Sequence, residues 1–207
     1  KGGHIGRYMR VMEILVELYM KQMNISPENK ELDNRDRFVL SKGHSVESYY
    51  AVLAKKGFFP MEEVISTFSQ FGSKFIGHPN NKLPGIEMNS GSLGHGLPVY
   101  VVMGDGELAE GSVWEGAMAA SHYCLDNLCA VVDRNRLQIS GCTEDVMGHD
   151  DLHERFRSFG WHVIDVADGN DIDQLDAAFE EAKTVKGKPT VLIANTVKGC
   201  GSPVMEN

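Results

Sequence analysis

Four short apolar runs in the second half of the chain constrain its fold more than any other feature. They are rich in β-branched residues and do not alternate strictly with polar ones, which is typical of parallel strands covered on both faces. The runs are VYVVM (99–103), CAVVD (129–133), HVIDV (162–166) and TVLIA (190–194). Helical stretches separate them, including 112–123 and 171–186. We therefore predict an α/β fold, a doubly wound and mostly parallel sheet with helices on both faces.

The first half of the chain is expected to be mainly helical. Segment 11–23, VMEILVELYMKQM, is apolar on a wide face at helical spacing, and further helices are expected at 45–56 and 61–71. A chain of 207 residues, 42% of them hydrophobic, can bury one sizeable core. We therefore expect a single domain over residues 1–207.

Composition argues against several classes of function. The net charge of −9 disfavours a nucleic-acid surface, which would normally carry a basic patch. No apolar run approaches the roughly 20 residues that span a bilayer. The four cysteines form no CxxC pair, and a chain with its own core needs no disulfide framework. These observations favour a cytoplasmic protein that binds neither nucleic acid nor membrane.

Polar residues that follow two of the predicted strands suit a divalent cation. Asp105 stands between two glycines after the strand at 99–103, and Asn135 follows the strand at 129–133, with the carbonyl of Leu137 nearby. In doubly wound sheets the ligand lies at the carboxyl ends of the strands. Mg²⁺ is usually held by one or two carboxylates together with phosphate oxygens, so the pattern predicts a site for Mg²⁺ and a diphosphate. Gly-Asp-Gly is also a common turn, and the motif alone leaves both interpretations open.

Further motifs run through nearly the whole chain. The longest is the stretch from Gly104 to Thr143, GDGELAEGSVWEGAMAASHYCLDNLCAVVDRNRLQISGCT. The others are GGHIG (2–6), NRDRFVLSKGH (34–44), GHP (77–79), GSLGHG (91–96), FGW (159–161) and GKPTVLIANTVKG (187–199). In this combination and order they resemble the transketolase family of thiamine diphosphate (ThDP) enzymes. The resemblance implies the diphosphate-binding domain of the ThDP fold.

The resemblance also implies roles for individual residues. The Mg²⁺ ligands would be Asp105, Asn135 and the Leu137 carbonyl, and Ca²⁺ could substitute for Mg²⁺. The cofactor would be contacted by His44, Gly91, Ser92, Leu93, Gly106 and Ile139. Catalytic positions would be His4 and His78, which would handle protons and hydroxyls of the sugar, and Glu110, which would lie between the two halves of the active site. Asp133 and Glu107 lie beside the expected ligands, and we expect them to form hydrogen bonds or caps rather than to coordinate the metal.

The implied activity is transfer of a two-carbon ketol unit from a ketose phosphate to an aldose phosphate. By this resemblance we expect the pyrimidine-binding domain of the family to be supplied by a partner, a C-terminal transketolase subunit, in a heterotetramer or another assembly based on dimers. Three alternatives stay open: a dihydroxyacetone synthase, an enzyme of the 1-deoxyxylulose-5-phosphate synthase type, and an inactive cofactor-binding assembly subunit.

One junction in the sequence departs from the family pattern. Only Leu97 and Pro98 stand between the loop at 91–96 and the strand that begins at Val99. A crossover between parallel strands needs a dozen or more residues. We therefore expect about twenty residues to be missing near 97–100 by comparison with the family. We also expect further segments before Lys1 and after Asn207.

Overall fold

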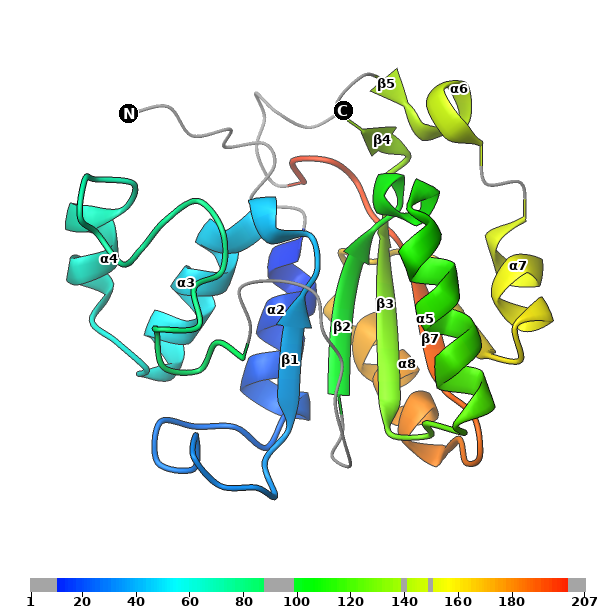
Figure 1. Ribbon diagram of the computed structural model, residues 1–207, viewed down its shortest axis with the longest axis horizontal. Coiled ribbons are helices and arrows are strands. Elements are labelled where there is room, and N and C mark those ends of the chain that lie inside the picture. Colours follow the sequence, from blue (N-terminus) through cyan, green and yellow to red (C-terminus); the bar gives the residue numbers. More distant parts are fainter. Residues whose placement is uncertain (1–10, 88–98, 139–140, 149–150, 201–207) are drawn as a thin grey trace.

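The computed structural model describes residues 11–87, 99–138, 141–148 and 151–200. In these ranges the chain forms a five-stranded parallel sheet in the order β1-β2-β3-β7-β6 (Figure 1). Its strands are β1 (Arg37–Leu40), β2 (Val99–Gly104), β3 (Leu128–Arg134), β6 (His162–Val166) and β7 (Thr190–Asn195). All four strands expected from the sequence are present, and the prediction of a doubly wound α/β fold is confirmed.

The fifth strand, β1, was not predicted. It has only four residues and begins with Arg37, so its apolar run is too short to stand out. It pairs in parallel with β2, Arg37 opposite Val99, and the connection between the two strands carries two helices. The crossover from β1 to β2 therefore includes these helices and is much longer than residues 97–98. Its length gives no reason to expect missing residues. A gap near 97–100 stays a prediction, because residues 97 and 98 lie outside the described residues.

The helices follow the expected pattern with small shifts at their ends. Helix α2 (Met12–Glu17) continues as a π-helical turn, η2 (Leu18–Gln22), and α4 (Met61–Thr67) ends four residues earlier than expected. Ser69 stops α4 because its φ of 55° is left-handed and its N–H bonds the Phe75 carbonyl. The other elements are α3 (Val46–Lys56), α5 (Gly111–His122), α6 (Thr143–Met147), α7 (Leu152–Ser158), α8 (Ile172–Thr184), the turns η3 (Gly43–Ser45) and η4 (Gly106–Ala109), and the antiparallel pair β4 (Leu137–Gln138) and β5 (Gly141–Cys142).

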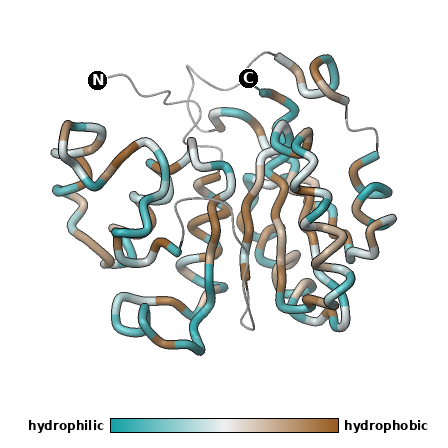
Figure 2. Tube along the Cα trace, in the orientation of Figure 1, coloured by the Kyte–Doolittle hydropathy of each residue, from teal (hydrophilic) through white to brown (hydrophobic). Residues whose placement is uncertain are grey.

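Each face of the sheet has its own hydrophobic core. Helices α2, α3 and α8 cover one face, where Val102, Val131 and Leu192 are fully buried. Helices α5 and α7 cover the other, where Val132 and Ile193 are fully buried (Figure 1). Figure 2 shows hydrophobic residues along the strands and polar ones on the outer loops. In the described ranges no helix combines the length and the apolar character needed to cross a membrane.

The parallel arrangement brings the carboxyl ends of all five strands to one edge of the sheet. The turns η3 and η4 follow β1 and β2 there, and the pair β4–β5 follows β3 (Figure 1). Backbone N–H groups and polar side chains that leave the sheet at this edge can converge on one ligand. The candidate site is therefore expected at this edge.

Candidate functional site

Asp105 is the buried carboxylate at the centre of the strand-end edge. It follows β2 directly, and only 2% of its surface is exposed. Its Oδ1 accepts the N–H of Gly106 at 2.8 Å, and its Oδ2 accepts the N–H of Arg136. Burial raises the pKa of the Asp105 carboxyl, although these two N–H groups and Lys42 act in the opposite direction. A cation beside this carboxylate would offset the unfavourable burial of its charge.

The loop after β3 folds over Asp105. Arg136 adopts a left-handed φ of 60°, which turns the chain so that its own N–H reaches the carboxylate. Asn135 is 8% exposed, and its Oδ1 accepts the N–H of Leu137 at 3.2 Å. The structure therefore brings together the three residues expected to hold a metal.

The chemistry of these donors fits Mg²⁺. Asp105, Asn135 and the Leu137 carbonyl would offer only oxygen atoms, which a hard cation prefers. Among the described residues no group of three or more His, Cys, Asp and Glu side chains could hold a metal. A cation at this edge would therefore depend on amide, carbonyl and ligand oxygens in addition to Asp105.

Gly106 lies where a side chain has no room. A Cβ at this position would stand 2.9 Å from Cβ of Gln138 and 2.8 Å from its Oε1, closer than normal contacts allow. Glycine therefore lets β4 pack against the turn that follows β2. The N–H of Gly106, a residue expected to contact the cofactor, donates to Asp105 in this structure.

A buried ion pair that was not predicted from the sequence lies beside the Asp105 carboxylate. Lys42, just after β1, donates through Nζ to Oδ2 of Asp133 at the end of β3, and the two side chains are 2% and 0% exposed. Thr196 donates its hydroxyl to the other oxygen of Asp133. The available signal was a charged residue, Asp133, at the end of an apolar strand, but its partner Lys42 lies 91 positions away.

The hydrogen-bonding roles expected for two acidic residues are confirmed. Asp133 is held by Lys42 and Thr196 as described. Glu107 accepts the hydroxyl of Ser41 through Oε1 and the N–H of Gly104 through Oε2, the latter at 3.2 Å. Both carboxylates thus link the carboxyl ends of different strands of the sheet.

Two of the expected histidines lie on segments that meet. His44 is in the turn η3, and its side chain is not among the described parts of the chain. His78 is exposed, and a Cβ on Gly43 would stand 3.0 Å from its Cδ2, so the imidazole packs against the residue before His44. The His78 carbonyl accepts the hydroxyl of Tyr50 at 3.0 Å, which anchors this loop to α3.

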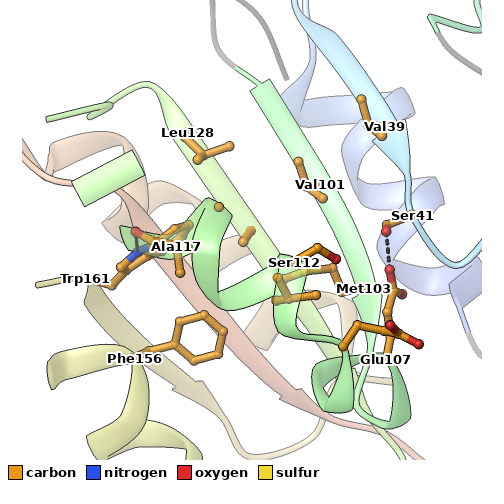
Figure 3. Close-up of a pocket in the computed structure, with 14 residues that line it drawn as sticks. Val39, Ser41, Val101, Met103, Glu107, Ser112, Ala117, Leu128, Phe156 and Trp161 are labelled. Carbon is orange, nitrogen blue, oxygen red and sulfur yellow. Dashed lines mark hydrogen bonds between the residues drawn. The ribbon is translucent and has the colours of Figure 1, made fainter. Parts of the chain in front are cut away.

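Glu110 lies at the mouth of a pocket between α5 and the sheet. The residue is exposed and stands at the N-terminal end of α5. The pocket has a volume of about 340 Å³ and is mainly apolar, with residues such as Val101 and Phe156 in its wall. Figure 3 shows that its polar end is formed by Glu107 and Ser41. The structure does not bring Glu110 into the hydrogen-bonded group around Asp105.

The remaining expected positions fall outside the described residues. These are His4, Gly91, Ser92, Leu93 and Ile139. Their roles stay predictions.

The sequence of the chain is similar to those of known proteins of one family. The family described as "Transketolase, thiamine diphosphate binding domain" matches residues 1–99 and 97–207. The chain is 44% identical to one subunit of the apulose-4-phosphate transketolase of Phocaeicola vulgatus, over all of this chain and 79% of that protein. It is 39% identical to 6-deoxy-6-sulfo-D-fructose transketolase subunit SqwG of a Clostridium species, over 99% of this chain and 80% of that protein.

A solved structure shows the same fold in a longer chain. Transketolase from Leishmania mexicana superimposes with a TM-score of 0.84 at 26% identity, covering 98% of this chain. The present chain spans 38% of that protein. The α/β architecture is thus that of a ThDP-binding fold. The chain therefore belongs to the transketolase family, in which it corresponds to the thiamine diphosphate-binding domain.

Proposed function

We propose that this chain is the ThDP-binding subunit of a split transketolase and transfers a two-carbon ketol unit from a ketose phosphate to an aldose phosphate. One observation carries the proposal: buried Asp105 lies under a loop that contains Asn135 and Leu137, at the carboxyl ends of the strands. These oxygen donors would suit Mg²⁺ bound together with a diphosphate.

Individual residues would share the work as follows. Asp105, Asn135 and the Leu137 carbonyl would hold Mg²⁺, or Ca²⁺ in its place, and Gly106 would leave room for the diphosphate. His44, Gly91, Ser92, Leu93 and Ile139 would contact the rest of the cofactor. When bound, the thiazolium ring supplies the carbon nucleophile and the electron sink that ketol transfer requires. His4 and His78 would bind sugar hydroxyls and move protons, because imidazole titrates close to neutral pH.

The activity would require a second subunit. Two similar proteins are named as transketolase subunits, and the present chain corresponds to 38% of a solved transketolase chain. We propose that the partner is a C-terminal, pyrimidine-binding subunit, in a heterotetramer or another dimer-based assembly. Exposed Glu110 would lie at the boundary between the two halves. The assembly would act on sugar phosphates in the cytoplasm, in the pentose phosphate pathway, and would need neither nucleic acid nor membrane.

The names of the relatives define the donors to be compared. They name apulose 4-phosphate and 6-deoxy-6-sulfo-D-fructose as substrates of those proteins. The deciding assay tests both, and xylulose 5-phosphate, against ribose 5-phosphate as acceptor, with ThDP and Mg²⁺. The chain is assayed alone and with a cognate pyrimidine-binding subunit. Transfer from any donor that requires both subunits supports the proposal. No transfer by a complex that binds the cofactor would favour another ThDP reaction or an inactive assembly subunit.

The metal assignment has its own test. Asp105→Ala removes the charged ligand, so binding of Mg²⁺–ThDP to the assembled complex should weaken by at least about 100-fold in titration calorimetry. Asp33→Ala is the matched control, because it removes an exposed carboxylate far from the strand ends. Circular dichroism of both variants checks the fold. Wild-type affinity in Asp105→Ala would refute the assignment.

A further inference from the structure

Lys42 has an unusual environment for a lysine. Its side chain is 2% exposed, and its ammonium is paired with fully buried Asp133. The second oxygen of Asp133 accepts the hydroxyl of Thr196, so this carboxylate is paired in charge and satisfied in hydrogen bonds. Removing two charges from water usually costs as much free energy as their attraction returns. The stability of the fold alone therefore gives little reason for an ion pair here.

The position of the ammonium suggests another reason. A Cβ on Gly104 would lie 3.8 Å from Cε of Lys42 and 3.9 Å from its Nζ, so the ammonium lies against the residue that precedes Asp105. The N–H of Asp105 donates to the carbonyl of Asp133 at 3.3 Å. Two carboxylates and one ammonium thus occupy a single buried region, where charges interact more strongly than in water.

The three almost completely buried charges of this region sum to one negative unit. Asp105 and Asp133 contribute two negative charges, and Lys42 cancels one of them. Glu107 lies at the edge, where it binds Ser41 and the Gly104 N–H, and Arg136 is exposed to water. A divalent cation at Asp105 would therefore leave an excess of positive charge in the buried region. That excess would attract the diphosphate of a cofactor.

We propose that Lys42 sets the charge of this site so that a divalent cation is retained together with a diphosphate and is held weakly without one. The inference rests on the proposed cofactor site and concerns a residue to which no role has been assigned. Without the ammonium, two carboxylates would neutralise the cation fully. The bare ion would then bind more tightly, and the diphosphate would lose its attraction.

The test measures two affinities whose changes have opposite signs. Mn²⁺, as a spectroscopic substitute for Mg²⁺, is titrated alone by electron paramagnetic resonance, and inorganic diphosphate is titrated by calorimetry at saturating Mg²⁺. In Lys42→Met the ion alone should bind at least about tenfold more tightly and the diphosphate at least about tenfold more weakly. Asp133→Asn keeps Lys42, so both changes should reverse. The double variant restores the net charge, and both affinities should return to within about threefold of wild type.

The outcomes separate this inference from the proposed function. If Lys42 serves only the fold, the two affinities will fall together or stay unchanged, and the inference is overturned. Should Lys42→Met fail to fold by circular dichroism, Asp133→Asn alone carries the test through its mirror-image pattern. If the folded wild-type chain binds neither Mn²⁺ nor Mg²⁺–diphosphate, even with its partner, the proposed cofactor site is itself wrong.

Discussion

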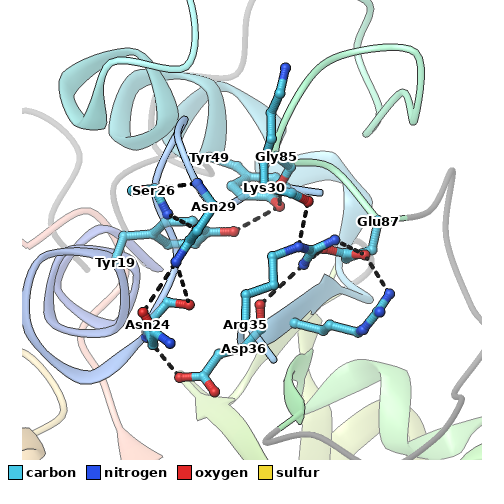
Figure 4. Close-up of polar contacts among 11 residues, drawn as sticks. Tyr19, Asn24, Ser26, Asn29, Lys30, Arg35, Asp36, Tyr49, Gly85 and Glu87 are labelled. Carbon is cyan, nitrogen blue, oxygen red and sulfur yellow. Dashed lines mark hydrogen bonds and ion pairs between the residues drawn. The ribbon is translucent and has the colours of Figure 1, made fainter. Parts of the chain in front are cut away.

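Two buried polar clusters in the described part of the chain differ in their chemistry. The charged cluster comprises Lys42, Asp133 and Thr196 and lies at the carboxyl ends of the strands. The neutral cluster comprises Tyr19, Tyr49 and the Gly85 carbonyl and lies beside β1 (Figure 4). In both, the polar side chains are almost completely shielded from water.

The neutral cluster fits a purely structural role. The two tyrosine hydroxyls are 2.9 Å apart, and Tyr49 also donates to the Gly85 carbonyl at 2.9 Å. Burial raises the pKa of both phenols well above their usual value, so they stay protonated over the physiological range. Their rings pack around Phe38, with centroids 5.5 and 5.1 Å from its ring. In this cluster, hydroxyl groups therefore satisfy the buried hydrogen-bonding groups, and no charge is buried.

The comparison shows two ways of satisfying buried polar groups in one protein. In the cluster at the flank of the sheet, where nothing in the proposed function needs a charge, the buried donors are neutral. At the strand ends, where a cation and a diphosphate are proposed to bind, ammonium and carboxylate groups are buried. The ion pair between Arg35 and Glu87 is intermediate: its side chains are 11% and 13% exposed, and it lies at the border of the neutral cluster (Figure 4).

Breaking the charged cluster should have the largest effect on stability. Lys42→Met leaves Asp133 buried without its counterion, and the free energy of unfolding should fall by about 3–5 kcal/mol. Lys42→Met combined with Asp133→Asn removes both charges and should recover most of that loss. Urea unfolding followed by circular dichroism measures both variants. Equal losses in the single and double variants would show that the cost does not come from an unpaired charge.

Breaking the neutral cluster should cost less. Tyr49→Phe removes one hydroxyl and leaves the Gly85 carbonyl without that donor, so the free energy of unfolding should fall by about 1–2 kcal/mol. The same urea titration measures the change. Tyr123→Phe removes the hydroxyl of an exposed tyrosine and serves as the control, with no change expected. A loss as large as that of Lys42→Met would remove the distinction between the two clusters.

The pH dependence of stability should distinguish the site carboxylate from the tyrosines. Burial raises the pKa of Asp105 above its ordinary 3.8, so between the two pKa values the folded chain binds more protons than the unfolded one. Stability therefore falls as the pH rises through that interval. Asp105→Asn removes this component, which cannot exceed about 1.4 kcal/mol per pH unit.

The corresponding measurement compares the two proteins without metal. Urea unfolding in a chelator, between about pH 3.5 and 8, should show the wild type losing stability relative to Asp105→Asn from about pH 3.8 upward. Tyr49→Phe should run parallel to the wild type over the same range. A difference between wild type and Asp105→Asn that stays constant with pH would contradict the burial of an ionised carboxylate.

A surface ion pair provides the smallest effect. On α8, Nζ of Lys183 lies 2.8 Å from Oε1 of Glu180, and the two side chains are 44% and 57% exposed. Water and salt screen such pairs, so Lys183→Ala should change the free energy of unfolding by less than about 0.5 kcal/mol. Repeating the titration in about 1 M salt should leave this value near zero. A change above about 1 kcal/mol would mean that the lysine has another contact.

The sequence predicted the central strands because their composition reflects burial on both faces. β2, β3, β6 and β7 are long enough for β-branched apolar runs to identify them, and Asp105 and Asn135 could be placed from the strand ends alone. β1 escaped prediction because a strand of four residues that begins with Arg37 carries too little pattern. The early end of α4 depended on the left-handed backbone of Ser69, which no apolar periodicity reveals.

By itself, the sequence determined the fold class, the family and the order of the motifs, since local composition and spacing carry that information. Only the tertiary structure decided that Lys42 pairs with Asp133, that Thr196 completes the pair, and that Arg136 turns its N–H toward Asp105. Such partners lie between 31 and 91 positions apart. They become neighbours because parallel strands bring their carboxyl ends to one edge of the sheet, and no local pattern encodes which charges then face each other.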